Sequence, residues 1–276
     1  MNESAINLGD TPSNIVEKQI TFGTNGIPLN GRIFIPADAD KDNRVPGAVL
    51  CHGFGNEQAA FEISARTMAE EGVMTLIFDF RGHGDSGGVL DGRVVEDVID
   101  AWDYLHAQPE IDHRRMGFVG HSMGAISAVM AAGKVKKAKA IVALACPGEI
   151  NHHILTDPGH IAYPWFRRAI AFAMKCGAII KRLKVKADLH RFLDAMPKMR
   201  ISEVLAGLED CSKLFVFCNN DNVTPYHRFL YSYAMASEPK QFLLTTGHHG
   251  TPIESDALRS QWTKWTIRTL RDKCDY

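Results

Sequence analysis

The sequence predicts one α/β domain in which a mostly parallel sheet of eight strands is covered by helices on both faces. Short apolar runs alternate with segments of helical periodicity along most of the 276 residues. The run at 73–80 is largely apolar, as is typical of a strand buried on both faces. Strands alternating with helices imply right-handed crossovers between parallel strands, and ligands then bind at the carboxyl ends of those strands.

The individual elements follow from local patterns. Two antiparallel strands are expected at 15–22 and 28–36, because Asn25-Gly26 supplies the positive φ of a tight turn. Apolar runs predict the remaining strands at 46–51, 73–80, 116–119, 139–145, 213–217 and 241–245. Helical spacing predicts helices at 61–71, 93–108, 123–135, from 226 and at 255–271.

One interval interrupts this alternation. No strand pattern occurs from 147 to 210, and such a length is too great for an unstructured loop in a compact domain. We therefore predict an inserted helical cap at 147–210, between a first core part at 1–146 and a second at 211–276.

Composition excludes several classes of protein. The net charge of −1 gives no global field toward nucleic acid, so no nucleic-acid partner is predicted. No leader-like N-terminus and no apolar stretch of about 18 residues is found, which favours a cytoplasmic protein. The six cysteines form no Cys-x-x-Cys pair and the twelve histidines no metal-binding helical spacing. Neither a disulfide, a metal nor a cofactor is expected.

The strongest chemical signal is the pentapeptide Gly-His-Ser-Met-Gly at 120–124, between the apolar run 116–119 and the helix expected from 123. Strand, turn and helix form the context of a nucleophile elbow, in which a strained turn projects the serine hydroxyl. Gly120 and Gly124 are small enough for strand and helix to approach closely. The alternative is a chance match in an ordinary turn, and the preceding buried strand argues against it. Ser122 is therefore predicted to be a nucleophile.

With this motif the chain resembles the α/β-hydrolase superfamily, and most of all its small esterase branch of feruloyl (cinnamoyl) esterases and monoacylglycerol-lipase-like hydrolases. Segment 51–55, Cys-His-Gly-Phe-Gly, is similar to the family's His-Gly segment. Segment 79–88, Asp-Phe-Arg-Gly-His-Gly-Asp-Ser-Gly-Gly, resembles its Asp-x-Arg-Gly-x-Gly-x-Ser turn. The resemblance covers nearly everything outside the predicted cap, and it implies the α/β-hydrolase fold and a serine, acid, histidine triad in that chain order.

The resemblance also implies an oxyanion hole. Ester cleavage passes through a tetrahedral oxyanion, which two preorganised N–H groups stabilise. By resemblance these are the backbone amides of Phe54 and Met123. The Met123 amide begins a helix, whose dipole favours an anion. His52 is expected to be structural.

The acid is predicted at Asp221. Segment 218–225 follows an apolar strand and is similar to the family's Gly-x-x-Asp-x-x-x-Pro turn, with Cys218 in place of the glycine. The alternative role for Asp221 is a helix cap, which Asn222 or Thr224 could provide equally well.

Two histidines compete for the role of the base. His248 and His249 both follow the last predicted strand. A small residue normally precedes the catalytic histidine, which favours His248 after Gly247, whereas counting along the strand from Lys240 fits His249 about as well. We predict His248, with His249 as the alternative.

The predicted cap is basic. Residues 164–200 contain ten Lys or Arg side chains against Asp188 and Asp194, interleaved with apolar residues. The favoured interpretation is a lid with a solvated charged face. The alternatives are a cap that receives an amphipathic or anionic acyl substrate, or one that contacts a membrane surface weakly.

These features together predict a carboxylesterase that cleaves a small-molecule acyl ester through an acyl-enzyme. A thioesterase or an acyltransferase would use the same triad. A peptidase is disfavoured because no amine-binding carboxylate cluster is evident, and a non-catalytic binding member would be expected to lack part of the triad. Acyl chain length and oligomeric state are not fixed by the sequence.

Overall fold

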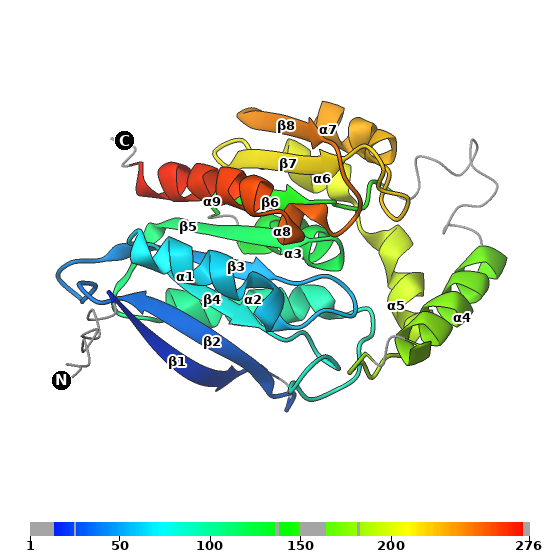
Figure 1. Ribbon diagram of the computed structural model, residues 1–276, viewed down its shortest axis with the longest axis horizontal. Coiled ribbons are helices and arrows are strands. Elements are labelled where there is room, and N and C mark those ends of the chain that lie inside the picture. The colour runs from blue at the N-terminus through cyan, green and yellow to red at the C-terminus, as the bar shows by residue number, and fades with distance from the viewer. Residues whose placement is uncertain (1–13, 25, 136–137, 150–163, 181–182, 273–276) are drawn as a thin grey trace, which may run out of the picture.

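The protein contains one eight-stranded sheet with strand order β1-β2-β4-β3-β5-β6-β7-β8 (Figure 1). The computed structural model describes residues 14–24, 26–135, 138–149, 164–180 and 183–272. Pairing is antiparallel for β1 with β2 and for β2 with β4, and parallel for all other neighbours. The strands are β1 (Ile15–Phe22), β2 (Leu29–Pro36), β3 (Val45–Cys51), β4 (Met74–Phe78), β5 (Ile111–His121), β6 (Ala140–Leu144), β7 (Ser212–Cys218) and β8 (Lys240–Thr245).

Helices cover both faces of this sheet, as predicted. In Figure 1, α1, α8 and α9 lie in front of the sheet and α2 and α3 behind it. The α-helices within the described ranges are α1 (Glu62–Glu70), α2 (Val94–His106), α3 (Met123–Val135), α4 (Pro164–Ile180), α5 (Leu189–Ala195), α6 (Ile201–Ala206), α7 (Leu230–Met235), α8 (Thr251–Glu254) and α9 (Asp256–Arg271). The expected mostly parallel α/β architecture is confirmed.

Two apolar layers hold the helices to the sheet. On the face of α1 and α9, the rings of Phe61 and Trp262 meet edge to face with centroids 6.1 Å apart. On the opposite face, Trp102 of α2 stacks on Phe118 of β5 at 4.6 Å. Trp102 belongs to the apolar stripe of α2, which is buried along its length. Helical periodicity therefore identified the face of α2 that packs on the sheet.

Strand β5 is longer than predicted. Its first half, residues 111–115, is mostly polar and partly exposed, so the apolar run identified only the buried second half. The two halves are joined across a register irregularity opposite Val45 and Gly47. A continuous apolar run marks only the part of a strand that is buried on both faces.

The parallel strands end at the same level. Cys51 pairs with Gly120, His121 with Leu144, and Cys218 with Thr245. The loops that follow β3, β5, β6, β7 and β8 therefore leave the same edge of the sheet. All sequence-predicted site residues lie in these loops or, in the case of Met123, on the first residue of the following helix.

Helices, and no strand, connect β6 to β7 within the described part of that interval. Helices α4 and α5 lie beyond the carboxyl ends of the strands (Figure 1), whereas α6 packs against α3 and α7 of the core. The segment before α5 is tied to the core by isolated bridges from His83 to Val185 and from Leu90 to Ala187. The division into cap and core at 147 and 210 stays a prediction, and α6 groups with the core layer.

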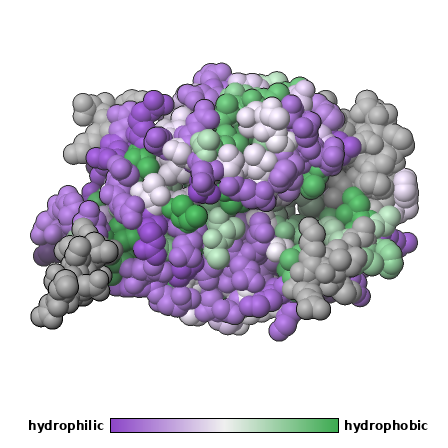
Figure 2. Space-filling model, viewed as in Figure 1, coloured by the Kyte–Doolittle hydropathy of each residue, from purple (hydrophilic) through white to green (hydrophobic). Residues whose placement is uncertain are grey.

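Hydrophobic side chains reach the surface on α4 and on β8. In Figure 2 they gather near α4 and near the edge strand β8, amid a mostly hydrophilic face. Trp165 and Phe172 of α4 are 61% and 71% exposed, and Leu244 of β8 is 43% exposed. Across the described ranges, no helix is both long and apolar enough to span a bilayer.

Candidate active site

Ser122 lies in a strained turn between β5 and α3. Its φ is +53°, a left-handed conformation that non-glycine residues rarely adopt. A Cβ at Gly120 would lie 2.4 Å from the carbonyl oxygen of Gly124, and a Cβ at Gly124 would lie 2.0 Å from that of Cys51. The Ser122 amide donates to the Leu144 carbonyl at 2.9 Å. Only glycine therefore allows strand and helix to meet at this turn.

Three side chains from separate loops form one hydrogen-bonded line. Nε2 of His249 lies 2.9 Å from Oγ of Ser122, and Nδ1 of His249 lies 2.8 Å from Oδ2 of Asp221. The Asp221 carboxylate is fully buried, whereas the His249 side chain is 22% exposed. The serine oxygen thus faces a base whose other nitrogen is held by a buried acid.

The preferred histidine, His248, does not join this line. Its side chain is 66% exposed and its Nε2 lies 3.5 Å from Oε2 of Glu254. The His248 amide donates to Oγ1 of Thr251 at 2.9 Å, which fixes the loop so that its side chain turns away from Ser122. The structure therefore corrects the preference for His248 in favour of the alternative, His249.

The Asp221 carboxylate is held by four donors. Oδ1 accepts from the amides of Val223 and Thr224, and Oδ2 lies within hydrogen-bond distance of Thr224 Oγ1 and His249 Nδ1. Burial raises the pKa of Asp221, but the hydrogen bonds from His249 and from Thr224 outweigh that effect and lower the pKa to about 2. The carboxylate is therefore ionised near neutral pH. Thr224, considered above only as a helix cap, is part of this support.

The turn after β3 lies against Ser122. A Cβ at Gly53 would be 3.4 Å from Cβ of Ser122, so the backbone of the next residue, Phe54, is adjacent to the serine. No hydrogen bond is formed by the Phe54 amide within the described parts of the chain. Met123 begins α3, where the first N–H groups have no partner inside the helix. Two donors suited to an anion thus flank Ser122.

Three buried histidines support this turn. Nδ1 of His52 lies 2.8 Å from the Gly53 carbonyl, Nε2 of His83 accepts from the Gly55 amide at 3.3 Å, and a Cβ at Gly53 would lie 2.8 Å from Nδ1 of His121. Burial lowers the pKa of His52 and His121 to about 4 and that of His83 to about 3. The three rings are therefore neutral near pH 7.

Sequence reasoning identified His52 as structural but missed His83 and His121. Both lie inside the motifs already quoted, at the variable positions of the 79–88 turn and of the elbow. The sequence shows these two histidines only as positions within the motifs. Their contacts with the turn after β3 join separate loops, and such contacts leave no local sequence pattern. In the 79–88 turn, Arg81 pairs with the buried Asp97 at 2.6 Å, which anchors the turn on α2.

In the portion of the chain that the structure describes, no group of three His, Cys, Asp or Glu side chains lies close enough together to hold an ion. The groups that the described site offers are a hydroxyl, an imidazole, a carboxylate and backbone amides.

A family model matches residues 46–204, and its description is serine aminopeptidase S33. Among curated relatives, the thiohydrolase aneE of Aspergillus aculeatus is 30% identical over 129 residues, which are 45% of this chain and 39% of that protein. The chain spans less than half the length of the first curated relatives that it matches.

Solved structures share the fold at low identity. A hypothetical protein of Pseudomonas aeruginosa superposes with a TM-score of 0.72 at 18% identity, over 93% of this chain and 94% of that one. Est1E of Butyrivibrio proteoclasticus, solved with ferulic acid, gives 0.68 at 18% identity over 90% and 96%. An esterase of Pyrococcus furiosus gives 0.67 at 18% identity over 98% and 96%. These similarities establish the architecture.

Proposed function

Since the chain belongs to the serine aminopeptidase S33 family of α/β-hydrolases, we propose that it is a serine hydrolase that cleaves carboxylic esters through an acyl-enzyme. The observation that carries the proposal is the line from Asp221 through His249 to Ser122, with spacings of 2.8 and 2.9 Å. The His249 imidazole is positioned to accept the serine proton, and the buried carboxylate fixes the tautomer that makes this possible.

The reaction follows from these positions. Oγ of Ser122 attacks the ester carbonyl while Nε2 of His249 takes its proton, and the resulting oxyanion accepts hydrogen bonds from the amides of Phe54 and Met123. Each such donor is worth about 3 kcal/mol when measured by removal. His249 then protonates the leaving alcohol. Water activated by the same histidine attacks the acyl-enzyme and releases the acid.

Thioester hydrolysis is the second candidate. It uses the same acyl-enzyme, and the similarity to a thiohydrolase of Aspergillus aculeatus favours it. Acyl transfer differs only in the nucleophile that accepts the acyl group.

An aminopeptidase needs a carboxylate for the substrate's ammonium group. Of the described carboxylates, Asp221 is held by His249 and Thr224, Asp97 by Arg81 and Asp188 by Arg191. An ester needs no such partner, so we propose an ester as the substrate.

A fluorophosphonate probe tests the nucleophile directly. It should label the wild-type protein at Ser122, and Ser122→Ala should abolish labelling and lower kcat by about 10⁶, because the three groups act as a unit. Ser260→Ala, a change at an exposed serine of α9, should leave both unchanged. Folded wild-type protein that resists the probe would refute the proposal.

Substrate class is tested by p-nitrophenyl esters of increasing chain length, acyl-CoA thioesters and aminoacyl p-nitroanilides under the same conditions. The proposal expects the esters to give the highest kcat/KM. A higher kcat/KM for thioesters would favour the second candidate, and one for the anilides would favour a peptidase.

A further inference from the structure

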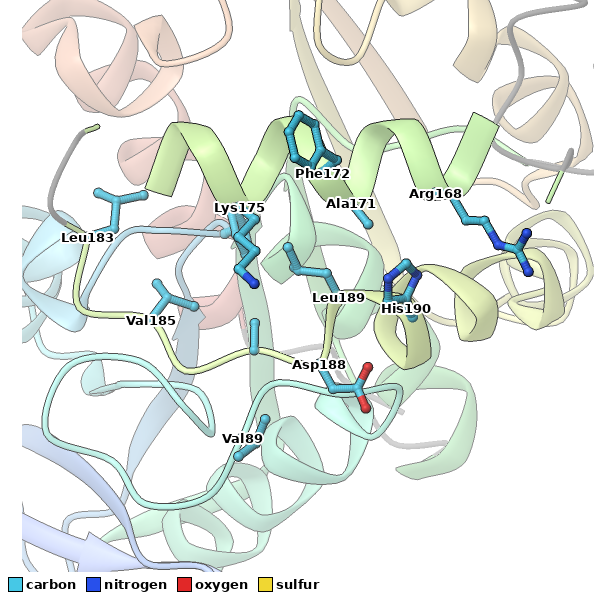
Figure 3. A pocket seen from close by; sticks show the side chains of 12 residues that line it. Val89, Arg168, Ala171, Phe172, Lys175, Leu183, Val185, Asp188, Leu189 and His190 are labelled. Atoms are coloured by element: carbon cyan, nitrogen blue, oxygen red, sulfur yellow. The ribbon is translucent and has the colours of Figure 1, made fainter. Parts of the chain in front are cut away.

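A cavity of about 750 Å³ lies between α4 and residues 183–190 (Figure 3). Its volume falls in the range of small-molecule sites. The lining is largely apolar, and its larger apolar side chains are Phe54, Val89, Phe172, Leu183, Val185 and Leu189. The cavity can therefore hold an extended hydrocarbon group.

Two cations, Arg168 and Lys175, lie in this lining. Arg168 and Lys175 project from α4, and Figure 3 shows both side chains directed to the side on which residues 183–190 lie. Neither forms an ion pair with any residue in the described ranges. The acidic side chain of the lining, Asp188, is already engaged, since it accepts from the Arg191 amide at 3.1 Å and lies 3.3 Å from its guanidinium. The described lining is therefore positive.

One short turn connects the cavity to Ser122. A Cβ at Gly53 would lie 3.4 Å from Cβ of Ser122, and a Cβ at Gly55 would lie 2.6 Å from Cδ1 of Leu183. Phe54, between the two glycines, lines the cavity with its side chain. Two residues of backbone span at most about 7 Å. A substrate bound at Ser122 thus has the cavity within reach of its next few carbon atoms.

We propose that the cavity selects substrates with an anionic group, a carboxylate or a phosphate, at the far end of an apolar segment, which Lys175 and Arg168 bind. This inference rests on the proposed ester or thioester hydrolysis and adds the substrate class. The apolar lining accommodates the segment, and the two cations complement the charge that such a substrate carries.

Matched substrate pairs test the inference. For a carboxylate on the acyl side, mono-p-nitrophenyl suberate is compared with its methyl-capped neutral ester. For a phosphate on the leaving group, the octanoyl ester of 8-hydroxyoctyl phosphate is compared with the neutral octanoyl ester of 8-methoxyoctan-1-ol. In at least one pair the wild-type kcat/KM should be higher for the anionic member, and the advantage should shrink as salt rises, because exposed charges are screened. The pair that shows it identifies the source of the anion.

Substitutions of the two cations test whether the preference for anionic substrates arises in the cavity. Lys175→Gln and Arg168→Gln should each lower the anionic-to-neutral ratio of kcat/KM about fivefold, which is the upper range for partly exposed ion pairs. The result is read from the ratio within each variant, so a general change in activity does not obscure it. Lys198→Gln, which removes an exposed cation outside the cavity lining, should leave the ratio unchanged and serves as the matched control.

The outcomes separate this inference from the proposed function. Turnover of neutral substrates with no anionic preference in either pair, or a preference that survives both substitutions, would overturn the anionic subsite and leave the hydrolase intact. Absence of both turnover and fluorophosphonate labelling would refute the hydrolase and the subsite together. A preference that falls in Lys175→Gln and Arg168→Gln, but not in Lys198→Gln, supports both.

Discussion

Nε2 of His121 lies 2.8 Å from the carbonyl oxygen of His249. Since a carbonyl only accepts, Nε2 carries the hydrogen and Nδ1 is unprotonated. His121 precedes Ser122 at the end of β5, and His249 follows β8, so this bond joins the strand before the proposed nucleophile to the loop that bears the proposed base. The rings of the two histidines are 4.8 Å apart between centroids. His249 is thus held by its backbone as well as by Asp221.

Replacing the two neighbouring histidines should give opposite results. His249→Ala should lower kcat by about 10⁶, because loss of one member disables the whole triad. His248→Ala should change kcat by less than about threefold, since its exposed side chain is paired with Glu254 and not with Ser122. Steady-state kinetics on one p-nitrophenyl ester checks both. Equal losses would contradict the geometry.

Asp221→Asn should keep the fold and lose most of the activity. An amide cannot stabilise the imidazolium or fix its tautomer, and the expected loss in kcat is about 10⁴. The exposed neighbour Asn222 provides the control, because Asn222→Ala leaves the carboxylate in place. Circular dichroism and kcat should be measured for both variants. Retained activity in Asp221→Asn would show that Asp221 is only a cap.

The protein should lose stability as the pH falls from about 6.5 to 4. Burial lowers the pKa of His52 and His121 to about 4, so both rings stay neutral in the folded protein down to that pH. In the unfolded chain the same histidines bind protons below their ordinary pKa of about 6.5. The stability that depends on these neutral rings is therefore fully present above about pH 6.5 and is lost progressively as the pH falls toward 4. Urea unfolding at pH 7, 6 and 5 measures the slope.

His121→Asn tests how much His121 contributes to the pH dependence of the free energy of unfolding. Removing one such histidine should reduce the slope between pH 6 and 5 by up to about 1.4 kcal/mol per pH unit, the value for one proton. The result is read from the slope, so a change in overall stability does not obscure it. An unchanged slope would show that His121 is not held neutral.

Gly124→Ala should destabilise the fold strongly. The added Cβ would lie 2.0 Å from the Cys51 carbonyl oxygen, and both are backbone positions that cannot move independently. We expect a loss of at least about 3 kcal/mol in the free energy of unfolding. Gly207→Ala is the matched control, because its Cβ would meet nothing closer than 3.7 Å. Denaturant unfolding of the two variants compares them.

Much of the fold could be predicted because its signals are local. β1 begins and ends at the predicted residues, and α3 does the same after the elbow. Buried parallel strands are continuous apolar runs, and α2 shows its buried stripe by periodicity. The polar first half of β5 was missed for the same reason, since partial exposure removes the pattern.

The sequence by itself determined the position of Ser122 in an elbow, since only glycines at 120 and 124 permit the approach of strand and helix. It also placed Asp221 in the loop after β7. It favoured His248 over His249 only through the preceding glycine, because the two histidines share the same loop and the same chemistry. That choice depends on the rotation of the loop, which is set by bonds from distant elements: Asn219 to the Gly247 amide and His121 to the His249 carbonyl. Contacts between separate loops exist only in the folded chain, so only the tertiary structure decided which imidazole faces the serine.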